Sequence, residues 1–173
     1  MEAVEFATVF ARLLRDGRLR DAFVAEPEAV AARMGVCGAD RAALLALDPG
    51  DLEFQARVLL GKRWAAARRI IPGTCRRLGD VAGSLFCDHA RNHWPDAVPA
   101  DLGDALSFCA WLVSSQPRAV EPSEWNRLRF LRSRGFLAVH VLRGHGVRRS
   151  TAVQILCGWM RSRPCELVLH ARF

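Results

Sequence analysis

The chain has 173 residues, of which 51% are hydrophobic and 25% charged, a composition typical of a packed globular protein rather than a disordered one. No apolar run reaches the roughly 18 to 20 residues of a membrane-spanning helix, and the first residues lack the basic and apolar regions of a signal peptide. We therefore expect a cytoplasmic protein without a membrane partner, and the net charge of +7 favours acidic partners.

The positive charge is concentrated in the last third of the chain. Residues 118–173 contain eleven arginines and three glutamates, a balance of +8, whereas the preceding residues sum to −1. Such a region attracts nucleic acid, an acidic peptide or an acidic protein surface, and charge alone does not choose among them. Six cysteines occur without a C-x-x-C pair, so we interpret them as reduced thiols.

Helical spacing of apolar residues dominates the first two thirds of the chain. The longest pattern follows the Asp48-Pro49-Gly50 turn and has one apolar and one basic face, and Pro72 with Gly73 ends or kinks it. Glycine and proline also mark the other expected helix ends. The spacing predicts helices over residues 4–14, 19–24, 27–34, 40–47, 51–71, 74–94 and 99–113.

The pattern changes after the proline- and serine-rich segment 114–124, which has the composition of a linker. A short helix or turn is expected near Trp125. Three runs rich in Val, Ile, Leu and Phe then predict antiparallel strands, over residues 136–142, 151–156 and 165–173. Three short strands need a packing partner to be stable.

The predicted fold class is therefore α+β, with an N-terminal multi-helix body followed by a small three-stranded antiparallel sheet. We expect two domains, a helical body over residues 1–117 and a basic β-sheet module over residues 118–173. The change in period and the change in charge fall at the same place, which supports this division.

A candidate metal or nucleophile site lies in the helical part. Cys87, His89 and His93 form the pattern C-D-H-x-x-x-H, in which two histidines four residues apart share one helix face. A tetrahedral zinc site needs four ligands, or three and a water, and the alternative is a solvated helix face with Cys87 buried. A Cys–His nucleophile has no local motif here. We rank a stand-alone metal-dependent enzyme third, after the two hypotheses for the predicted sheet given below.

The predicted sheet offers a different kind of site, because an open strand edge can accept a peptide as an additional strand. The alternative is that both edges are covered, as native folds usually arrange. Backbone groups then provide affinity, while flanking arginines hold acidic side chains. The predicted peptide-binding residues are Phe136, Leu137, Ala138, Val139, His140, Val141, Leu142, Arg143, Arg148, Arg149, Ala152, Val153, Gln154, Ile155, Leu156 and Cys157.

A nucleic-acid-binding regulator that uses the same basic sheet is the second hypothesis. Sheets that bind single strands present aromatic side chains among the basic ones, and only Phe136 and Phe173 qualify here. Nucleic acid is therefore disfavoured. Stacking losses on substitution of the two phenylalanines by alanine would distinguish this hypothesis from peptide binding, at about 1 to 3 kcal/mol per base.

Three stretches carry a family resemblance: FARLLRDGRLRDAFVAEPEAVAARMGV (10–36), GKRWAAARRIIPGTCRRLG (61–79) and DALSFCAWL (104–112). They resemble the small partner subunits of multinuclear non-heme iron oxidative enzymes in the biosynthesis of ribosomally made, modified peptides (RiPPs). The methanobactin partner subunit is the type example of this family. The resemblance covers most of the chain and is loosest at the C-terminus.

The resemblance implies a non-catalytic accessory subunit that forms a heterodimer with a TIM-barrel iron enzyme. It implies that the helical body docks on the enzyme and that the sheet takes up the leader region of the precursor peptide as an added strand. The cysteines of the core peptide then reach the iron. No cofactor is expected in this chain, because the iron ligands would lie on the partner enzyme; iron bound by Cys87, His89 and His93 would contradict the assignment.

Overall fold

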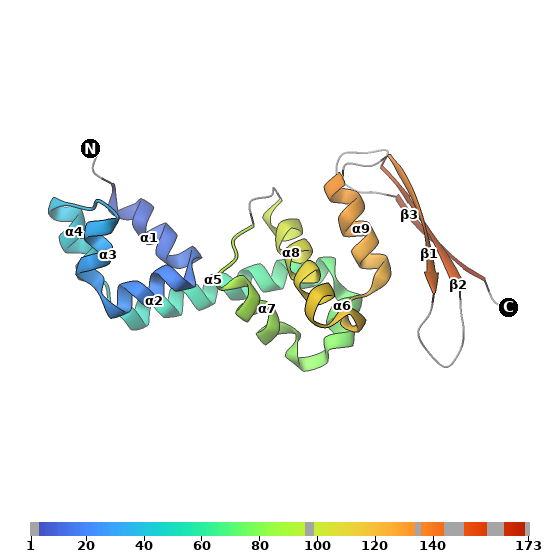
Figure 1. Cartoon of the computed structure of the whole chain (residues 1–173), viewed down its shortest axis with the longest axis horizontal. Coiled ribbons are helices and arrows are strands. Elements are labelled where there is room, and N and C mark those ends of the chain that lie inside the picture. The colour runs from blue at the N-terminus through green and yellow to red at the C-terminus, as the bar shows by residue number, and fades with distance from the viewer. Residues whose placement is uncertain (1–3, 96–98, 134–135, 144–150, 159–164, 172–173) are drawn as a thin grey trace. The chain divides into compact units, whose positions relative to one another are not determined.

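A computed structural model describes residues 4–95, 99–133, 136–143, 151–158 and 165–171. In these residues the chain folds into a series of helices, α1 to α9, followed by a three-stranded antiparallel sheet (Figure 1). The predicted α+β fold class is thereby confirmed.

Most elements begin and end close to the residues that proline, glycine and apolar spacing indicate. Pro27 and Pro72 each open a helix, where their missing N–H is not needed. The elements are α1 (Phe6–Arg15), α2 (Gly17–Ala25), α3 (Pro27–Arg33), α4 (Gly38–Leu45), α5 (Pro49–Ile70), α6 (Pro72–Leu78), η1 (Gly79–Val81), α7 (Ala82–Ala90), α8 (Ala100–Ser115), η2 (Pro117–Ala119), α9 (Pro122–Ser133), β1 (Leu137–Arg143), β2 (Thr151–Cys157) and β3 (Cys165–Ala171).

The helix expected from Thr74 onwards is divided at Gly79 into α6, the 3-10 turn η1 and α7. Gly79 has a φ of 62°, a left-handed conformation that glycine adopts at little cost. Val81 has the helical spacing of a core residue, but it is 52% exposed in the intervening turn. A periodic pattern alone did not reveal this break.

Contacts divide the chain into two compact units, residues 1–67 with 80–104, and residues 68–79 with 105–173. The second unit contains the sheet together with α6, α9 and the part of α8 after residue 104. The predicted boundary between residues 117 and 118 lies inside this second unit. The division of labour between a docking body and a peptide module stays a prediction.

The first unit has an apolar core built by α1 to α4 and the start of α5. A buried charge also stabilises it, because Arg20, which is 2% exposed, donates to a Glu53 carboxylate oxygen at 2.8 Å and to the Leu13 carbonyl at 2.9 Å. A buried guanidinium needs such partners. The core residues are Val9, Leu13, Phe23, Val30, Ala31, Val36, Leu44 and Leu52.

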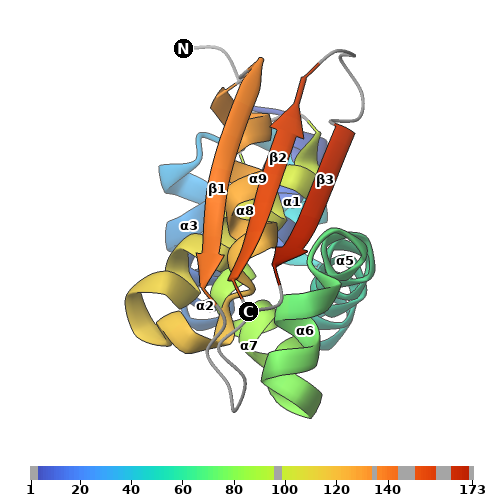
Figure 2. The same ribbon diagram turned by 90° about the vertical axis from the view of Figure 1, so that its right-hand side faces the viewer.

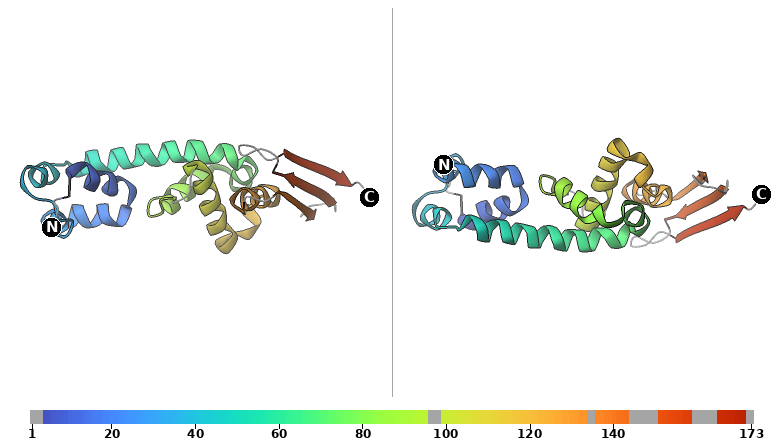
Figure 3. Two further views of the ribbon diagram at one scale, coloured as in Figure 1. Left: turned by 90° about the horizontal axis from the view of Figure 1, so that it is seen from above. Right: turned by 90° about the horizontal axis from the view of Figure 1, so that it is seen from below.

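The second unit places α9 between α8 and the sheet (Figures 1 and 3). The sheet has the order β1-β2-β3, and both pairs are antiparallel. Leu128 of α9 and Leu156 of β2 are each fully buried, so apolar packing covers the inner face of the sheet.

A buried carboxylate joins α6 to α9 in the second unit. Glu124 is 5% exposed and accepts hydrogen bonds from the Gly73 N–H at 2.5 Å, the Thr74 N–H at 2.8 Å and the Thr74 hydroxyl at 2.8 Å. It therefore satisfies donors at the start of α6, where a negative charge is favourable. Gly73 permits this approach, because a Cβ there would lie 2.9 Å from a Glu124 carboxylate oxygen.

Polar side chains also attach the sheet to α9. Gln154 of β2 is fully buried, and its amide nitrogen donates to the Ser123 carbonyl at 2.8 Å and to a Glu166 carboxylate oxygen at 2.7 Å. Its amide oxygen accepts from Asn126 at 3.2 Å. Two of these bonds join β2 to α9, and the third joins β2 to β3. Together they hold the inner face in one register against α9.

Candidate functional site

The two faces of the sheet differ in exposure. On β2, Ala152, Gln154 and Leu156 are buried against the rest of the unit. The opposite face carries aliphatic side chains from all three strands in register, and those of β1 and β3 are between 52% and 64% exposed. This side of the sheet, away from α9, faces the viewer in Figure 2. We call it the outer apolar face, formed by Leu137, Val139, Val141, Val153, Ile155, Leu167 and Leu169.

The outer face of this sheet departs from the usual arrangement. An antiparallel sheet with one wet face normally turns polar side chains to water and apolar ones to the core. Here the polar Gln154 and the ion-paired Glu166 lie on the inner side, while branched aliphatic side chains face outward. Exposed apolar patches of this kind mark interaction sites.

One edge of the sheet, along β1, has unpaired backbone groups in the described part of the chain. The Gly158 N–H donates to the Phe136 carbonyl at 2.8 Å, which identifies these two residues as a hydrogen-bonded pair. Such pairs alternate along antiparallel strands, so the N–H and C=O groups of Leu137, Val139 and Val141 point away from β2. These three residues also contribute to the outer apolar face.

The central position of β2 corrects one expectation. Residues Ala152 to Cys157 were a candidate edge for strand addition, but β2 pairs with β1 on one side and with β3 on the other. Both rows of its backbone groups are therefore used. A peptide can pair with β1, and the β2 residues can contribute only through their side chains.

The outer edge of β3 also lacks a paired strand in the described residues, but its surroundings differ. Arg127 of α9 donates to a Glu166 carboxylate oxygen at 3.2 Å and to the Ile70 carbonyl at 2.5 Å. Figure 2 shows α6 on this side of the sheet. In Figure 2 the later part of α8 appears on the β1 side of the view, but Figures 1 and 3 show α9 between α8 and the sheet.

The other predicted peptide-binding residues are distributed over several places. Phe136 directly precedes β1 and is 87% exposed, and Arg143 is the last residue of β1. Ala138, His140 and Leu142 alternate with the outward residues and are partly buried. Two of the predicted arginines and the second candidate stacking residue lie outside the described residues: Arg148, Arg149 and Phe173.

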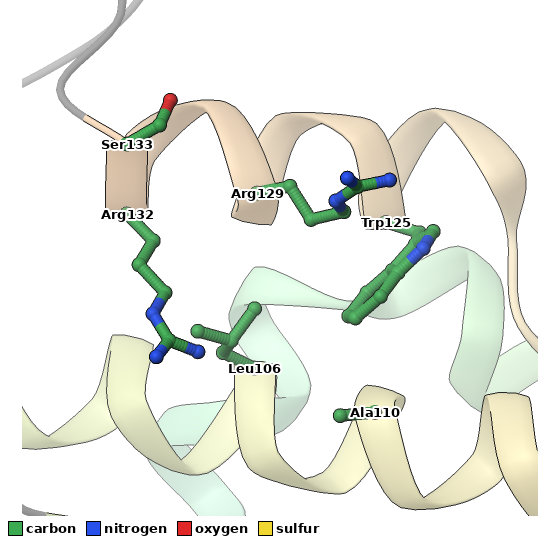
Figure 4. Close-up of a pocket in the computed structure, with 6 residues that line it drawn as sticks. All are labelled: Leu106, Ala110, Trp125, Arg129, Arg132 and Ser133. Atoms are coloured by element: carbon green, nitrogen blue, oxygen red, sulfur yellow. The ribbon is translucent and has the colours of Figure 1, made fainter.

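Sequence reasoning missed a cavity of about 360 Å³ between α8 and α9 (Figure 4). The guanidinium carbon of Arg129 lies 5.9 Å from the centre of the Trp125 ring, within reach of a cation–π contact. The lining residues are Leu106, Ala110, Trp125, Arg129, Arg132 and Ser133. Four of them follow the helical spacing of α9, a signal that was lost because this segment was expected to be a short helix or turn.

The candidate metal group does not converge on one point. The imidazole rings of His89 and His93 stack with centroids 4.5 Å apart and an interplanar angle of 11°. Ring nitrogens coordinate a metal in the ring plane, so two parallel stacked rings cannot both direct a nitrogen at one ion about 2 Å away. Among the residues the structure describes, no group of three or more His, Cys, Asp or Glu side chains is placed to hold a metal.

Burial also affects the thiols that a nucleophile hypothesis would use. It raises the pKa of Cys75 and Cys87, and it raises the pKa of Cys109 to about 12, with the charge of Glu124 adding to the effect there. A nucleophilic cysteine needs a thiolate, which a lowered pKa provides. These three thiols have the protonation expected of structural cysteines.

His89 gives a prediction about pH. Burial, together with the nearby charges of His93 and Arg63 and partly offset by Asp104, lowers the pKa of His89 from 6.5 to about 4. The folded state therefore favours the neutral ring. The contribution of the neutral His89 ring to the free energy of unfolding is complete above pH 6.5 and is lost as the pH falls through about 4.

Urea unfolding between pH 7 and pH 4 checks this expectation. The free energy of unfolding of the wild-type chain should fall more steeply with acid than that of a His89→Gln variant, which cannot bind the proton. His140→Gln, in the second unit, is the control. Parallel pH profiles for the wild type and His89→Gln would contradict the prediction.

The chain matches no family model, and no curated protein or solved structure is significantly similar to it. Within the residues described, no helix is both long and apolar enough to cross a membrane. The features that bear on function are therefore the sheet, its open edge and the charges near it.

Proposed function

We propose that the chain is a non-catalytic partner subunit that binds a ribosomal precursor peptide by strand addition. It presents the peptide to a multinuclear iron oxidative enzyme for modification of cysteine. The observation that carries this proposal is the unpaired β1 edge beside the outer apolar face. In this proposal the iron lies in the partner enzyme, and the complex works in the cytoplasm, where thiols remain reduced.

The backbone of β1 provides the affinity in this scheme. Leu137, Val139 and Val141 each direct one N–H and one C=O outward, so an extended peptide finds alternating donors and acceptors at strand spacing. Each hydrogen bond contributes a net of about 0.5 to 1.5 kcal/mol. Several together give useful binding with little demand on the peptide sequence.

The side chains of the outer apolar face provide the selectivity. Residues directly opposite each other on antiparallel strands point to the same face. A peptide with apolar residues at every second position would therefore extend the rows that begin at Leu137, Val139 and Val141. We expect this face to be covered when enzyme, peptide and partner subunit assemble, which accounts for aliphatic side chains that are otherwise in water.

The aliphatic character of the outer face favours a peptide over nucleic acid. Sheets that bind single-stranded nucleic acid use aromatic side chains as stacking platforms and basic side chains for the phosphates. The described side chains of the outer face include neither kind. Phe136 is exposed but lies before the first strand rather than within the face.

Co-expression tests the proposal. The chain is produced with an iron-enzyme candidate encoded beside it and a short acidic, cysteine-bearing peptide from the same genomic region. The products are separated by size exclusion and analysed for metal. A one-to-one complex that binds the peptide and whose iron stays with the large subunit supports the proposal. A monomer that elutes alone with its own metal or with nucleic acid contradicts it.

A further inference from the structure

The arginines of α9 differ in how they are paired. Arg127 is committed to the fold, because it donates to both Glu166 and the Ile70 carbonyl. Arg129 and Arg132 are exposed, and neither forms a hydrogen bond or ion pair with another described residue. Their guanidinium groups are therefore available to bind a negatively charged ligand.

The cavity that these two arginines line has a consistent chemistry. None of its lining residues is acidic, and Trp125, Leu106 and Ala110 provide apolar surface next to the guanidinium groups. In Figure 4 the Arg132 side chain extends from α9 toward Leu106 of α8, whereas the Arg129 side chain runs along α9 toward Trp125. Guanidinium groups bind carboxylates with two parallel hydrogen bonds, and an indole ring packs against flat or aliphatic groups.

We propose that this cavity binds an acidic side chain of the peptide, with Arg129 and Arg132 holding the carboxylate and Trp125 packing against a neighbouring apolar side chain. This inference rests on the proposed function for the identity of the ligand. It assigns the recognition of acidic residues to Arg129 and Arg132, rather than to the overall positive charge of this part of the chain.

The geometry of strand addition makes this assignment reasonable. Side chains of an added strand alternate between the outer apolar face and the opposite side, which is the side that α9 occupies. In Figure 2 the later part of α8 appears on the β1 side of the view. Ser123 and Asn126 contact β2, whereas Arg129 and Arg132 lie on the side of α9 that faces α8. The acidic residue that they hold is therefore one just beyond the paired segment of the peptide, not one within it.

The test uses a probe too short to pair with β1, N-acetyl-Leu-Glu-amide, followed through the Trp125 indole N–H signal by NMR. The glutamine analogue of this dipeptide should bind at least about tenfold more weakly, since hydrogen bonds to charged groups are the stronger ones. Arg129→Gln and Arg132→Gln should each reduce the affinity for the glutamate probe by about the same factor. They should leave the affinity for the glutamine analogue unchanged.

Arg76→Gln is the matched control, because Arg76 is an exposed arginine of the same unit outside the cavity. An equal loss of affinity in Arg76→Gln would show general charge attraction and would overturn the proposal. The proposal would also be overturned if the cavity variants changed only the melting temperature, since the arginines would then merely stabilise the end of α9.

A substitution at the strand edge separates this inference from the proposed function. Val139→Pro should leave the affinity for the dipeptide unchanged and lower the affinity for a longer peptide that can pair with β1. If the dipeptide fails to bind but the longer peptide remains sensitive to Val139→Pro, the cavity assignment is wrong and strand addition stands. If the dipeptide binds as expected and Val139→Pro does not change the affinity for the longer peptide, the cavity assignment stands and strand addition is wrong.

Discussion

Val139→Pro should weaken the binding of a precursor peptide by about 2 kcal/mol, or roughly thirtyfold in dissociation constant. Val139 directs its N–H away from β2, so proline removes a donor to the added strand and places its ring in the path of the peptide. The bonds between β1 and β2 use other residues, and proline is tolerated on an edge strand at such a position. The measurement is isothermal titration of the peptide into each variant.

Val139→Thr is the control for this experiment, since threonine keeps the N–H, the β-branched shape and the strand propensity. Circular dichroism of both variants confirms that the sheet is retained. If Val139→Pro binds the peptide as tightly as Val139→Thr does, β1 is not the acceptor strand. A proline at Val168 of β3 would then test the other edge, because the alternation of pairs directs the Val168 N–H outward there.

Glu124→Ala should lower the free energy of unfolding by about 3 kcal/mol or more, because the substitution leaves buried donors without an acceptor. The carboxylate accepts from the backbone N–H groups of Gly73 and Thr74 and from the Thr74 hydroxyl. No other group in the described residues bonds to those two N–H groups at the start of α6. Urea unfolding followed by circular dichroism measures the loss.

Glu121→Ala is a matched control in the same segment. Its carboxylate pairs with Arg77 at 2.7 Å, but the two side chains are 30% and 41% exposed, so the pair should contribute about 1 kcal/mol at most. Glu124→Gln should lie between the two alanine variants, because the amide retains one acceptor oxygen. Equal stability of Glu124→Ala and Glu121→Ala would show that the buried carboxylate does not join α6 to α9.

The helix ends could be predicted because the residues that determine them act locally. Pro72 separates α5 from α6, and glycines or prolines lie at most other ends. The extent of α9 could not be predicted in this way. Its 12 residues carry little apolar periodicity, and the helix is stabilised by distant contacts such as those of Glu124 with Gly73 and Thr74.

The segment 114–124 shows how composition can mislead. Its prolines and serines are typical of a linker, yet Val120 and Glu124 are each about 5% exposed or less. The backbone N–H of Glu121 donates to the Thr74 hydroxyl, 47 residues earlier. A contact between residues so far apart in the sequence cannot be predicted from the local residue types.

The strands could be predicted from their alternation, but their faces and order could not. On β3 the two rows begin with Cys165 and Glu166, and the row with Leu167 and Leu169 is exposed although it is the more apolar of the two. The choice is made by α9, which binds Gln154 through Ser123 and Asn126. The candidate edge at Ala152 to Cys157 was likewise decided by strand order, a property of the whole sheet.

The unpaired β1 edge also affects how the chain behaves at high concentration. An antiparallel edge is complementary to itself, so two copies can pair β1 with β1 about a two-fold axis and join their outer apolar faces into one sheet twice as wide. Self-association then competes with the ligand by mass action, and the apparent affinity for a peptide declines as the protein is concentrated. Producing subunit and ligand together in equal amounts would keep this edge occupied by the correct strand.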